Sequence, residues 1–454
     1  MSKPICVVTA PVATRSGYGA HSRDICRALI KLDKFDVKIW SVRWGNTPMN
    51  ALNQDDPNDK VIIDRLLVEP NLPSQPELHI HIVIPNEFQP FAKYNIGITA
   101  GLESTVCPPE WIQGMNKMNL NIVPSHFVKD TINALGFDIQ NEQTNQVEGV
   151  LKNEKPIEVL FEGVDTNIYK KTNEFSKPLV DELSQIEEQF SFLYVGHWLQ
   201  GGLGRDRKDT GMLVKVFCET FKNMKTQPAL IMKTSSAGFS VLDREEMLNR
   251  INEIKSTIKG KLPNIYLLHG DFTDDEINGL YNHPKVKAHV TFTHGEGFGR
   301  PLLEATLSEK PVIAPKWSGH VDFLDSSKSV VLDGQLTAVE KGSFPDNFYV
   351  EGAHWFTVNY QKASQTLRTI YRSYKKYTSN AKKLALQNKS KFSLDAMTIE
   401  FGNILDKYVP EFPKEVKIQL PKLKKVGGEL DYEEDEKRAR TRPPKIKLPK
   451  LKKV

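Results

Sequence analysis

The stretch HGEGFGRPLLEATLSEKPVIAP, residues 294–315, decides the fold that this sequence predicts. A run of β-prone residues ends near Thr293, and a glycine-rich turn follows it before Pro301. Because proline is favoured in the first turn of a helix, we expect a helix over LLEATL and a strand over PVIAP. The stretch is therefore typical of a strand–turn–helix–strand unit in a parallel α/β sheet.

Two carboxylates lie in this unit, Glu296 in the turn and Glu304 about one turn into the helix. Ligands of such sheets bind beyond the carboxyl ends of the strands, so we expect both side chains at the same mouth of the sheet. Ionised carboxylates are pure hydrogen-bond acceptors, which suits the hydroxyl groups of a sugar and of a ribose. The N–H groups of residues 297–299 would start the helix, where an anion is favoured.

Outside this unit, short apolar runs alternate with longer amphipathic stretches, which is the pattern of βα units. A first series predicts strands at 5–11, 36–42, 78–84, 94–100 and 120–125. A second series predicts strands at 190–196, 228–234, 264–270, 287–293, 310–315 and 328–332. A helix with one apolar face is expected over 391–409. We therefore expect an α/β protein with two doubly wound, Rossmann-like domains facing across a cleft, residues 1–185 and 186–390.

Composition agrees with a globular protein of two or three domains: 454 residues, 39% hydrophobic and 26% charged. No run approaches the ~18 apolar residues of a membrane span, and the N-terminus is typical of a first strand rather than a signal peptide. Four cysteines lie far apart without CxxC spacing, so we expect no disulfide framework or zinc site, and a cytoplasmic location.

The last 45 residues differ from the rest. Residues 410–454 hold 14 Lys and Arg and 8 Asp and Glu, so the body of the chain is close to neutral and offers no electrostatic case for nucleic acid. VKIQLPKLKKV (416–426) recurs as PKIKLPKLKKV (444–454). Proline and dense charge predict a disordered tail. The duplication favours a recognition peptide for a macromolecular partner, by strand addition or by binding to an acidic surface, although a merely solvated tail stays open.

Two glutamates with seven residues between them, embedded in EGFGRPLLEA and followed by PVIAP, resemble the signature of the retaining glycosyltransferases of GT-B fold and family 4 type. Three further stretches resemble elements of that family: VPSHFVKDTI (123–132), FEGVDTNIYKK (161–171) and FLYVGHWLQGGLGRDRKDTGMLVKVF (192–217). The likeness covers about residues 1–409, where 391–409 matches the helix that returns to the N-terminal domain. The tail has no counterpart in the general family.

The resemblance implies transfer of a sugar from a nucleoside diphosphate sugar to a hydroxyl acceptor with retention, using no metal or other cofactor. Glu296 would hold the donor sugar and Glu304 the ribose. The family arginine that follows VG is His197 here, which leaves Arg205 or Arg207, with Lys208, to neutralise the departing diphosphate. Further donor-binding residues would be Gly17, Tyr18, Gly19, Lys233, Gly297, Phe298 and Gly299.

Other polar residues receive narrower predictions. Glu103, in ITAGLESTVCPPEW (98–111), resembles a family stretch and would orient or deprotonate the acceptor; the alternative is a carboxylate that caps a helix. His79 and His81 share a strand face, and without a third ligand nearby we expect packing rather than a metal pair. His294 could contact the donor. Glu309 stands where the family has a glycine of positive φ, at a cost of roughly 1 kcal/mol.

Two other functions stay open on this fold. One is a nucleotide-sugar epimerase or a sugar phosphorylase, and the other is a non-catalytic nucleotide-sugar-binding or assembly protein. The acceptor is not predicted: a glycan, a lipid-linked sugar, a protein, a small molecule or a modified DNA base all fit. The sugar and base of the donor are not predicted either.

Overall fold

The fold is described from a computed structural model. The structure describes residues 3–69, 72, 74–141, 143–144, 146–236, 238–344 and 348–412. The chain divides into two units, Met1–Glu411 and Phe412–Val454. Both copies of the duplicated basic motif, 416–426 and 444–454, lie outside the described residues, so the structure does not test the predicted tail.

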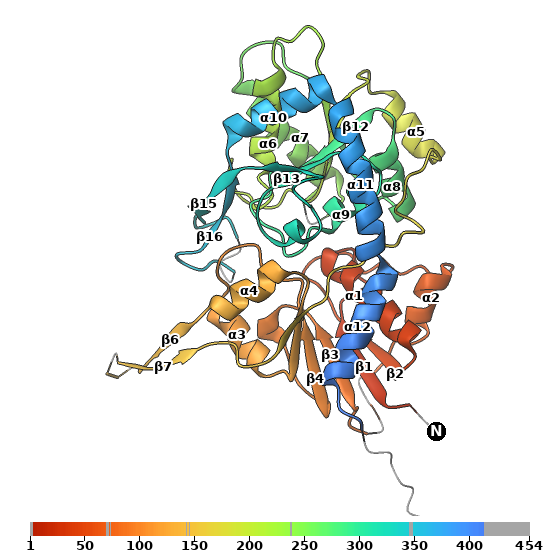
Figure 1. The fold of residues 1–454 in the computed structure, drawn as a ribbon, viewed down its shortest axis with the longest axis vertical. Coiled ribbons are helices and arrows are strands. Elements are labelled where there is room, and N and C mark those ends of the chain that lie inside the picture. Colours follow the sequence, from red (N-terminus) through yellow and green to blue (C-terminus); the bar gives the residue numbers. More distant parts are fainter. Residues whose placement is uncertain are drawn as a thin grey trace, which may run out of the picture. The chain divides into compact units, whose positions relative to one another are not determined.

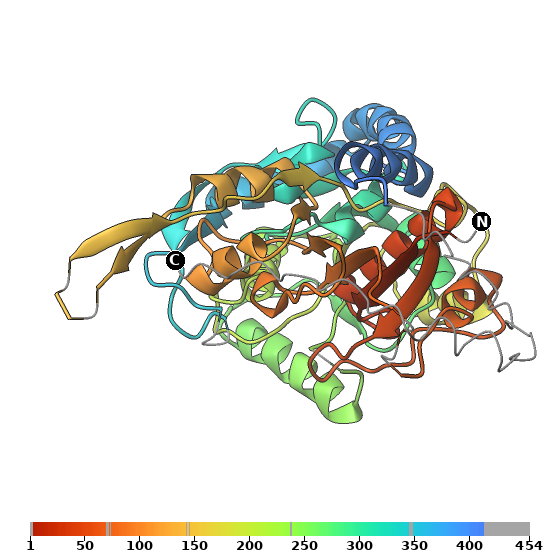
Figure 2. The same cartoon turned by 90° about the horizontal axis from the view of Figure 1, so that it is seen from below.

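The first sheet has six parallel strands in the order β2-β1-β3-β4-β5-β8 (Figure 1). Its strands are β1 (Ile5–Ala10), β2 (Asp36–Ser41), β3 (Leu78–Ile82), β4 (Tyr94–Ile98), β5 (Leu120–Val123) and β8 (Ile157–Val159). The helices around it are α1 (Gly17–Leu32), α2 (Pro57–Ile63), α3 (Pro109–Asn116), α4 (His126–Ala134) and the short η1 (Pro85–Glu87). We call this sheet and its helices the N-terminal lobe. A hairpin, β6 (Phe137–Gln140) and β7 (Val147–Leu151), projects from it (Figure 2).

The second sheet also has six parallel strands, in the order β11-β10-β9-β12-β13-β14. They are β9 (Ser191–Val195), β10 (Ala229–Lys233), β11 (Ile265–Leu268), β12 (Val286–Val290), β13 (Val312–Pro315) and β14 (Val330–Leu332). The helices are α5 (Lys177–Ser184), α6 (Thr210–Phe221), α7 (Val241–Ser256), α8 (Asp274–Asn282), α9 (Arg300–Thr306), η2 (Gly319–Asp322), α10 (Tyr360–Ser373) and α11 (Lys375–Lys391). An antiparallel pair, β15 (Gly334–Ala338) and β16 (His354–Val358), completes this C-terminal lobe.

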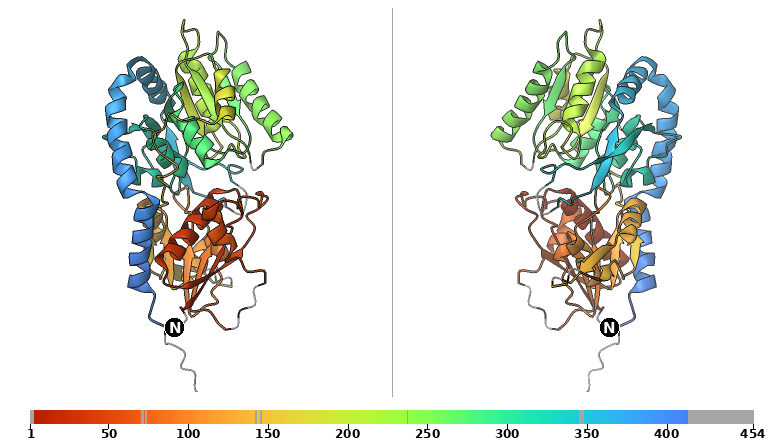
Figure 3. Two further views of the ribbon diagram at one scale, coloured as in Figure 1. Left: turned by 90° about the vertical axis from the view of Figure 1, so that its right-hand side faces the viewer. Right: turned by 90° about the vertical axis from the view of Figure 1, so that its left-hand side faces the viewer.

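The last described helix, α12 (Leu394–Tyr408), packs on the first sheet's lobe rather than on the second. The Ser393 side chain accepts a hydrogen bond from the Ala396 N–H and so caps its start. Met397 and Phe401 on its apolar face are buried in the same cluster as Ile25 and Leu29 of α1. Burial of a side chain such as Phe401 stabilises the fold by ~1.5–3 kcal/mol, which ties the end of the chain to its beginning. Figure 3 shows α11 and α12 following one another along one side.

The structure confirms the predicted α/β class with two doubly wound parallel sheets. Each predicted strand of the two series is present, although β12 ends at Val290 rather than near Thr293. Helix α1 begins at Gly17 directly after the loop that leaves β1. The Ser16 side chain accepts a hydrogen bond from the Gly19 N–H and so caps the start of this helix.

The apolar runs of the sequence become the strands because both faces of each sheet are covered by helices. Ile80 and Ile96 in the first sheet and Phe192 and Leu230 in the second are fully buried. In the described part of the chain, no helix is both long and apolar enough to cross a membrane. All four cysteines are buried and unpaired.

Candidate active site at the switch point of the second sheet

The strand order of the second sheet places two loops side by side. Successive strands run outward in one direction from β9 to β10 and β11, and in the other from β12 to β13 and β14, so the order reverses between β9 and β12. The loops that leave the carboxyl ends of these two strands diverge there, and ligands of doubly wound sheets bind in the crevice this creates. They are residues 196–209 after β9 and 291–299 after β12.

A cluster of charged side chains occupies this position. The Lys208 ammonium pairs with Oε1 of Glu296, and the Arg207 guanidinium lies 3.6 Å from Oε2 of the same carboxylate. The Arg207 guanidinium also lies 3.4 Å from Oε1 of Glu103, which follows β4 of the other lobe. Four sequence-predicted residues are therefore brought together: Glu103, Arg207, Lys208 and Glu296. We call these four residues the cation cluster.

The electrostatics of the cation cluster favour an ionised Glu296. Burial alone would raise the pKa of Glu296, but the charges of Lys208 and Arg207 outweigh it and lower the pKa to about 2. Burial lowers the pKa of Lys208, and the Glu296 carboxylate opposes that effect. Burial also raises the pKa of Glu103, which Arg207 partly offsets. Two fixed cations thus stand beside one firmly ionised carboxylate, an arrangement that suits a ligand with both hydroxyl and anionic groups.

The glycine turn that carries Glu296 is held against the N-terminal lobe. A Cβ at Gly295 would lie 2.1 Å from the carbonyl oxygen of Glu103, and one at Gly297 would lie 2.0 Å from that of Ala100. The Ser125 hydroxyl donates to the Gly297 carbonyl at 2.7 Å. These two glycines are therefore required by close backbone approach between the lobes.

Glu304 lies in a separate group of side chains. The Arg300 side chain donates to one Glu304 oxygen at 3.0 Å and the Tyr281 hydroxyl to the other at 3.4 Å. Arg300 also pairs with Asp24 on α1 of the other lobe. Burial raises the pKa of Glu304 to about 7, against the effect of Arg300 and with that of Asp274. Glu304 therefore has different charged neighbours from Glu296.

Glu162 belongs to this second group, which we call the acid cluster: Asp24, Glu162, Arg300 and Glu304. Glu162 is buried in the segment that follows β8. Burial raises its pKa to about 7; the charge of Arg300 lowers it and that of Asp24 raises it again. Three carboxyl groups share one guanidinium, so at least one of them is favoured in its protonated form near neutral pH.

Of the two arginines proposed for the diphosphate, the structure separates Arg207 from Arg205. The Arg205 side chain is 56% exposed and pairs with Glu340, away from Glu296, whereas Arg207 is 19% exposed and lies within the cluster. Lys233, at the end of β10, lies 5.3 Å from the ring centres of both Phe239 and Phe272. It does not join the cation cluster.

Three of the four other predicted donor-binding residues, Tyr18, Gly19 and Phe298, are packed within their own lobes. The Tyr18 hydroxyl lies 2.9 Å from the Thr99 hydroxyl, and its ring stacks on Trp44. A Cβ at Gly19 would lie 2.2 Å from the Thr14 carbonyl oxygen, so packing within the lobe explains this glycine; a Cβ at Gly17 would meet open space. Phe298 is 2% exposed and packs on Phe323, so its side chain belongs to the core.

The structure also shows the surroundings of two of the histidines and the backbone conformation of Glu309. His294 is fully buried, and its ring stacks on Trp355. The His79 ring is buried and lies 3.0 Å from the Thr9 hydroxyl, as expected for packing. No group of three or more metal-ligating side chains occurs in the described ranges. Glu309 has φ of 62°, so a non-glycine residue does occupy the left-handed position.

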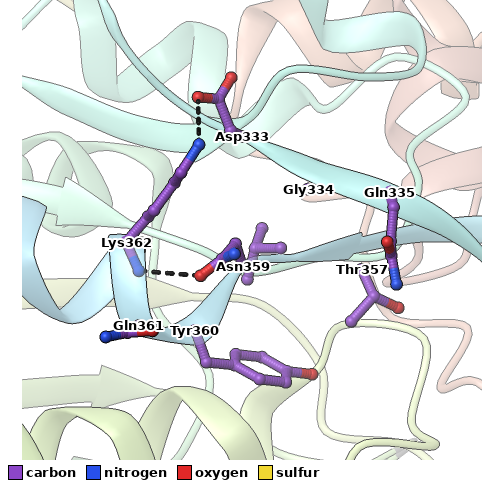
Figure 4. Close-up of a pocket in the computed structure, with 9 residues that line it drawn as sticks. Asp333, Gly334, Gln335, Thr357, Asn359, Tyr360, Gln361 and Lys362 are labelled. Carbon is purple, nitrogen blue, oxygen red and sulfur yellow. Dashed lines mark hydrogen bonds and ion pairs between the residues drawn. The ribbon is translucent and has the colours of Figure 1, made fainter.

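A pocket of about 440 Å³ lies next to this region (Figure 4). It is lined by Asp333, Gly334, Gln335, Thr357, Val358, Asn359, Tyr360, Gln361 and Lys362. Its side chains come from β15, β16 and the start of α10, and the Tyr360 hydroxyl donates to Asp209 at 2.8 Å. The pocket therefore borders the loop of Arg207 and Lys208 at Asp209, and its lining includes none of the four residues of the cation cluster.

Sequence reasoning missed Asp24, Glu162 and Arg300. Arg300 stands inside the quoted motif between the two glutamates, so its charge was a readable signal. Asp24 lies 276 residues away on a helix whose pattern shows only core and surface, and nothing in the sequence links it to Arg300.

Comparisons with known proteins agree with this architecture. No family model matches the chain. Over 194 residues the chain is 28% identical to the capsular polysaccharide biosynthesis glycosyltransferase CapM of Staphylococcus aureus, which covers 43% of this chain and 44% of that relative. The chain thus matches less than half the length of this curated relative.

Solved structures match over most of the chain. Sucrose-phosphate synthase from Thermosynechococcus elongatus superposes with a TM-score of 0.59 at 12% identity, over 89% of this chain and 98% of that one. Anabaena HepE in complex with UDP-glucose gives a TM-score of 0.55 at 14% identity, over 89% and 100%. At these identities the likeness shows the fold alone: two Rossmann-like domains in the GT-B arrangement.

Proposed function

We propose that this chain is a retaining glycosyltransferase of the family 4 type, which moves a sugar from a nucleoside diphosphate sugar to a hydroxyl acceptor. One observation carries the proposal: Arg207 and Lys208 after β9 meet Glu296 after β12 at the switch point of the second sheet. Two supports are independent of it. The chain has the GT-B arrangement, and HepE, one of the proteins that share it, was solved with UDP-glucose.

The cation cluster matches the needs of such a reaction. Departure of a nucleoside diphosphate builds negative charge, which preorganised cations stabilise best in a site that excludes water. Arg207, rather than Arg205, and Lys208 would take this role. Glu296, ionised beside them, would accept hydrogen bonds from the donor sugar's hydroxyls, and the sugar would then replace part of its contact with Lys208.

The two lobes would contribute different parts. Glu103 comes from the N-terminal lobe and faces Arg207, which supports a role in orienting the acceptor or taking its proton. Glu304 would hold the ribose: a carboxylate has about four lone-pair sites, so contacts with Arg300 and Tyr281 leave acceptor capacity. Contacts across the lobes at Gly295 and Gly297 would exclude water and so suppress donor hydrolysis.

A screen of nucleotide sugars by thermal stabilisation tests the binding half of this proposal, since a ligand that binds only the native state raises the melting temperature with its affinity. UDP-, GDP- and ADP-sugars should be compared, with and without EDTA. We expect the nucleotide sugars of one base to raise the melting temperature, and we expect EDTA to leave this increase unchanged. No stabilisation by any nucleoside diphosphate or its sugars would contradict the proposal.

Lys208→Ala should weaken binding of that nucleoside diphosphate by ~1.5–3 kcal/mol, the value of a hydrogen bond to a charged group. Lys215→Ala is the matched control, a lysine on α6 just beyond the same loop. Incubation of the bound nucleotide sugar without an acceptor separates the alternatives, because an epimerase would still convert it.

A further inference from the structure

Two buried polar atoms behind the cation cluster have no hydrogen-bond partner in the described structure: Oδ1 of Asp209 and Nε2 of His294. They lie 3.8 Å from each other, and both side chains are fully buried. Unsatisfied buried polar atoms are rare in native proteins because each loses its hydrogen bonds to water without replacement, so two such atoms that face each other require an explanation.

The remaining atoms of both side chains are held firmly. The Tyr360 hydroxyl donates to Oδ2 of Asp209 at 2.8 Å. Nδ1 of His294 lies 2.9 Å from the carbonyl oxygen of Phe356, and the ring stacks on Trp355 at 4.1 Å. The 3.8 Å between Oδ1 of Asp209 and Nε2 of His294 is longer than a hydrogen bond, so the pair closes only if one side chain shifts toward the other.

The partners determine where the protons are. The Phe356 carbonyl can only accept, so Nδ1 carries a hydrogen, and in a neutral ring Nε2 is then an acceptor. An acceptor facing a carboxylate oxygen needs a proton between them. Burial of both groups disfavours the charged forms. The same burial lowers the pKa of His294 to about 4, against the carbonyls of Phe356 and Gly204, and raises that of Asp209, which the Tyr360 hydroxyl opposes and Asp206 reinforces.

We propose that Asp209 and His294 share one proton as a neutral hydrogen-bonded pair, and that this pair positions the loop of Arg207 and Lys208 against the turn of Glu296. This inference rests on the proposed function only because the residues that the pair would position, Arg207, Lys208 and Glu296, are the proposed donor-binding residues. Asp209 directly follows Lys208, and His294 stands two residues before Glu296. The backbone N–H of His294 also donates to the backbone carbonyl of Arg207 at 2.9 Å.

The two loops are therefore linked by the Lys208–Glu296 ion pair, by the backbone hydrogen bond from His294 to Arg207, and, in this proposal, by Asp209 and His294. A bound diphosphate would draw the Lys208 ammonium away from Glu296, and the pair of Asp209 and His294 would keep the loops in register at that moment. Asp209 has φ of 49°, a strained conformation for a residue other than glycine, which suits a side chain kept for its position.

The test compares two substitutions of one residue in the full chain. Asp209→Asn keeps an acceptor for Tyr360 and an N–H donor for Nε2, whereas Asp209→Leu removes both. With UDP as the calorimetric probe, we expect D209N to bind within about 3-fold of the unchanged protein and D209L to bind at least about 10-fold more weakly. Equal binding by D209L would overturn the positioning role, and loss in D209N would show that a charged pair is needed.

Nitrogen NMR of the histidine rings provides a readout that does not depend on UDP. We expect His294 to keep the neutral tautomer with hydrogen on Nδ1 between about pH 6 and about pH 8, where an unperturbed histidine titrates. In D209L its Nε2 signal should move; if D209L does not fold, Tyr360→Phe, which removes the donor to Asp209, replaces it. An imidazolium across this range contradicts the neutral pair. His79→Gln, which alters a buried histidine of the other lobe, is the control and should leave both readouts unchanged. Failure of the unchanged protein to bind UDP would count against a uridine donor, while the NMR result would still decide the pair.

Discussion

Glu296 and Glu304 lie eight positions apart in one motif, yet the structure places them in opposite electrostatic settings. The cation cluster sets Arg207 and Lys208 around Glu296 and lowers its pKa to about 2. The acid cluster sets Asp24 and Glu162 around the Arg300–Glu304 pair, and the pKa of Glu304 is raised to about 7. Pairs of carboxyl groups whose environments separate their pKa values mark different chemical roles. A permanently charged acceptor and a carboxyl that can hold a proton therefore occur in one strand–turn–helix unit.

The substitution with the largest expected effect removes a charge from the cation cluster. Glu296→Gln removes the charge that balances Arg207 and Lys208 and should lower the rate of nucleoside diphosphate release from the donor by ~100-fold or more, as for loss of one preorganised electrostatic partner. The melting temperature and circular dichroism should show that the fold persists. A rate within about 3-fold of the unchanged protein would remove Glu296 from the site.

The comparison also predicts opposite pH dependences of stability. Glu304 keeps its proton up to about pH 7 in the native protein, whereas the unfolded chain loses this proton at about pH 4.3. The free energy of unfolding therefore falls as the pH rises between these two values. Glu296 stays ionised down to about pH 2, so its stabilisation is complete above about pH 4.3 and is lost as pH falls toward 2.

Urea unfolding across pH measures this difference. Glu304→Gln should remove a loss of up to ~4 kcal/mol between about pH 4.3 and about pH 7, at ~1.4 kcal/mol per pKa unit. Glu296→Gln should instead remove an acid-side loss of similar size. Glu162→Gln is the internal check on the acid cluster, because its pKa is also raised to about 7 and it should behave like Glu304→Gln. If E296Q and E304Q changed the pH dependence of the unfolding free energy in the same direction, the contrast between the two glutamates would be refuted.

A smaller effect separates the two arginines. Arg207→Ala should weaken binding of the nucleoside diphosphate by ~1.5–3 kcal/mol, because its guanidinium is largely buried beside two carboxylates. Arg205→Ala removes an exposed pair with Glu340 and should change binding by less than ~0.5 kcal/mol. Calorimetry on both variants checks the assignment, and a larger loss in Arg205→Ala would reverse it.

The smallest expected effect concerns the end of the helix that carries Glu304. Glu309 has φ of 62°, and Glu309→Gly should relieve this conformation and stabilise the protein by ~0.5–1 kcal/mol, net of the greater chain entropy of glycine. The unfolding midpoint measures this gain. Nucleotide binding should not change, since Glu309 contacts neither cluster; a stability loss would mean that its side chain has a role that the backbone angle does not reveal.

Much of the architecture was predictable because it depends on local patterns. Apolar runs such as ICVVTA and FLYV bury both faces of a strand, and the helix over 394–408 has its apolar residues on one side. The patterns do not predict β8, which has only three residues, or the hairpin of β15 and β16. β15 and β16 pair antiparallel outside both six-stranded sheets, so the alternation of strands and helices that predicts the other strands does not apply to them.

The site was predictable only in part. The glycine turn, Pro301 and both glutamates are legible within one stretch, and Lys208 and Glu103 follow strands in the order that brings them to the same mouth. The sequence could not choose between Arg205 and Arg207, because both follow β9 by similar distances and only the path of the loop buries one and exposes the other.

By itself, the sequence determined the alternation of strands and helices, the two parallel sheets and the residues that follow each strand, since these depend on spacing along the chain. Only the tertiary structure decided that Glu103 faces Arg207, that Asp24 meets Arg300, and that Glu296 and Glu304 differ in charge state. The reason is that a pKa and an ion pair depend on burial and on charges a few ångströms away, and those neighbours come from parts of the chain tens to hundreds of residues apart.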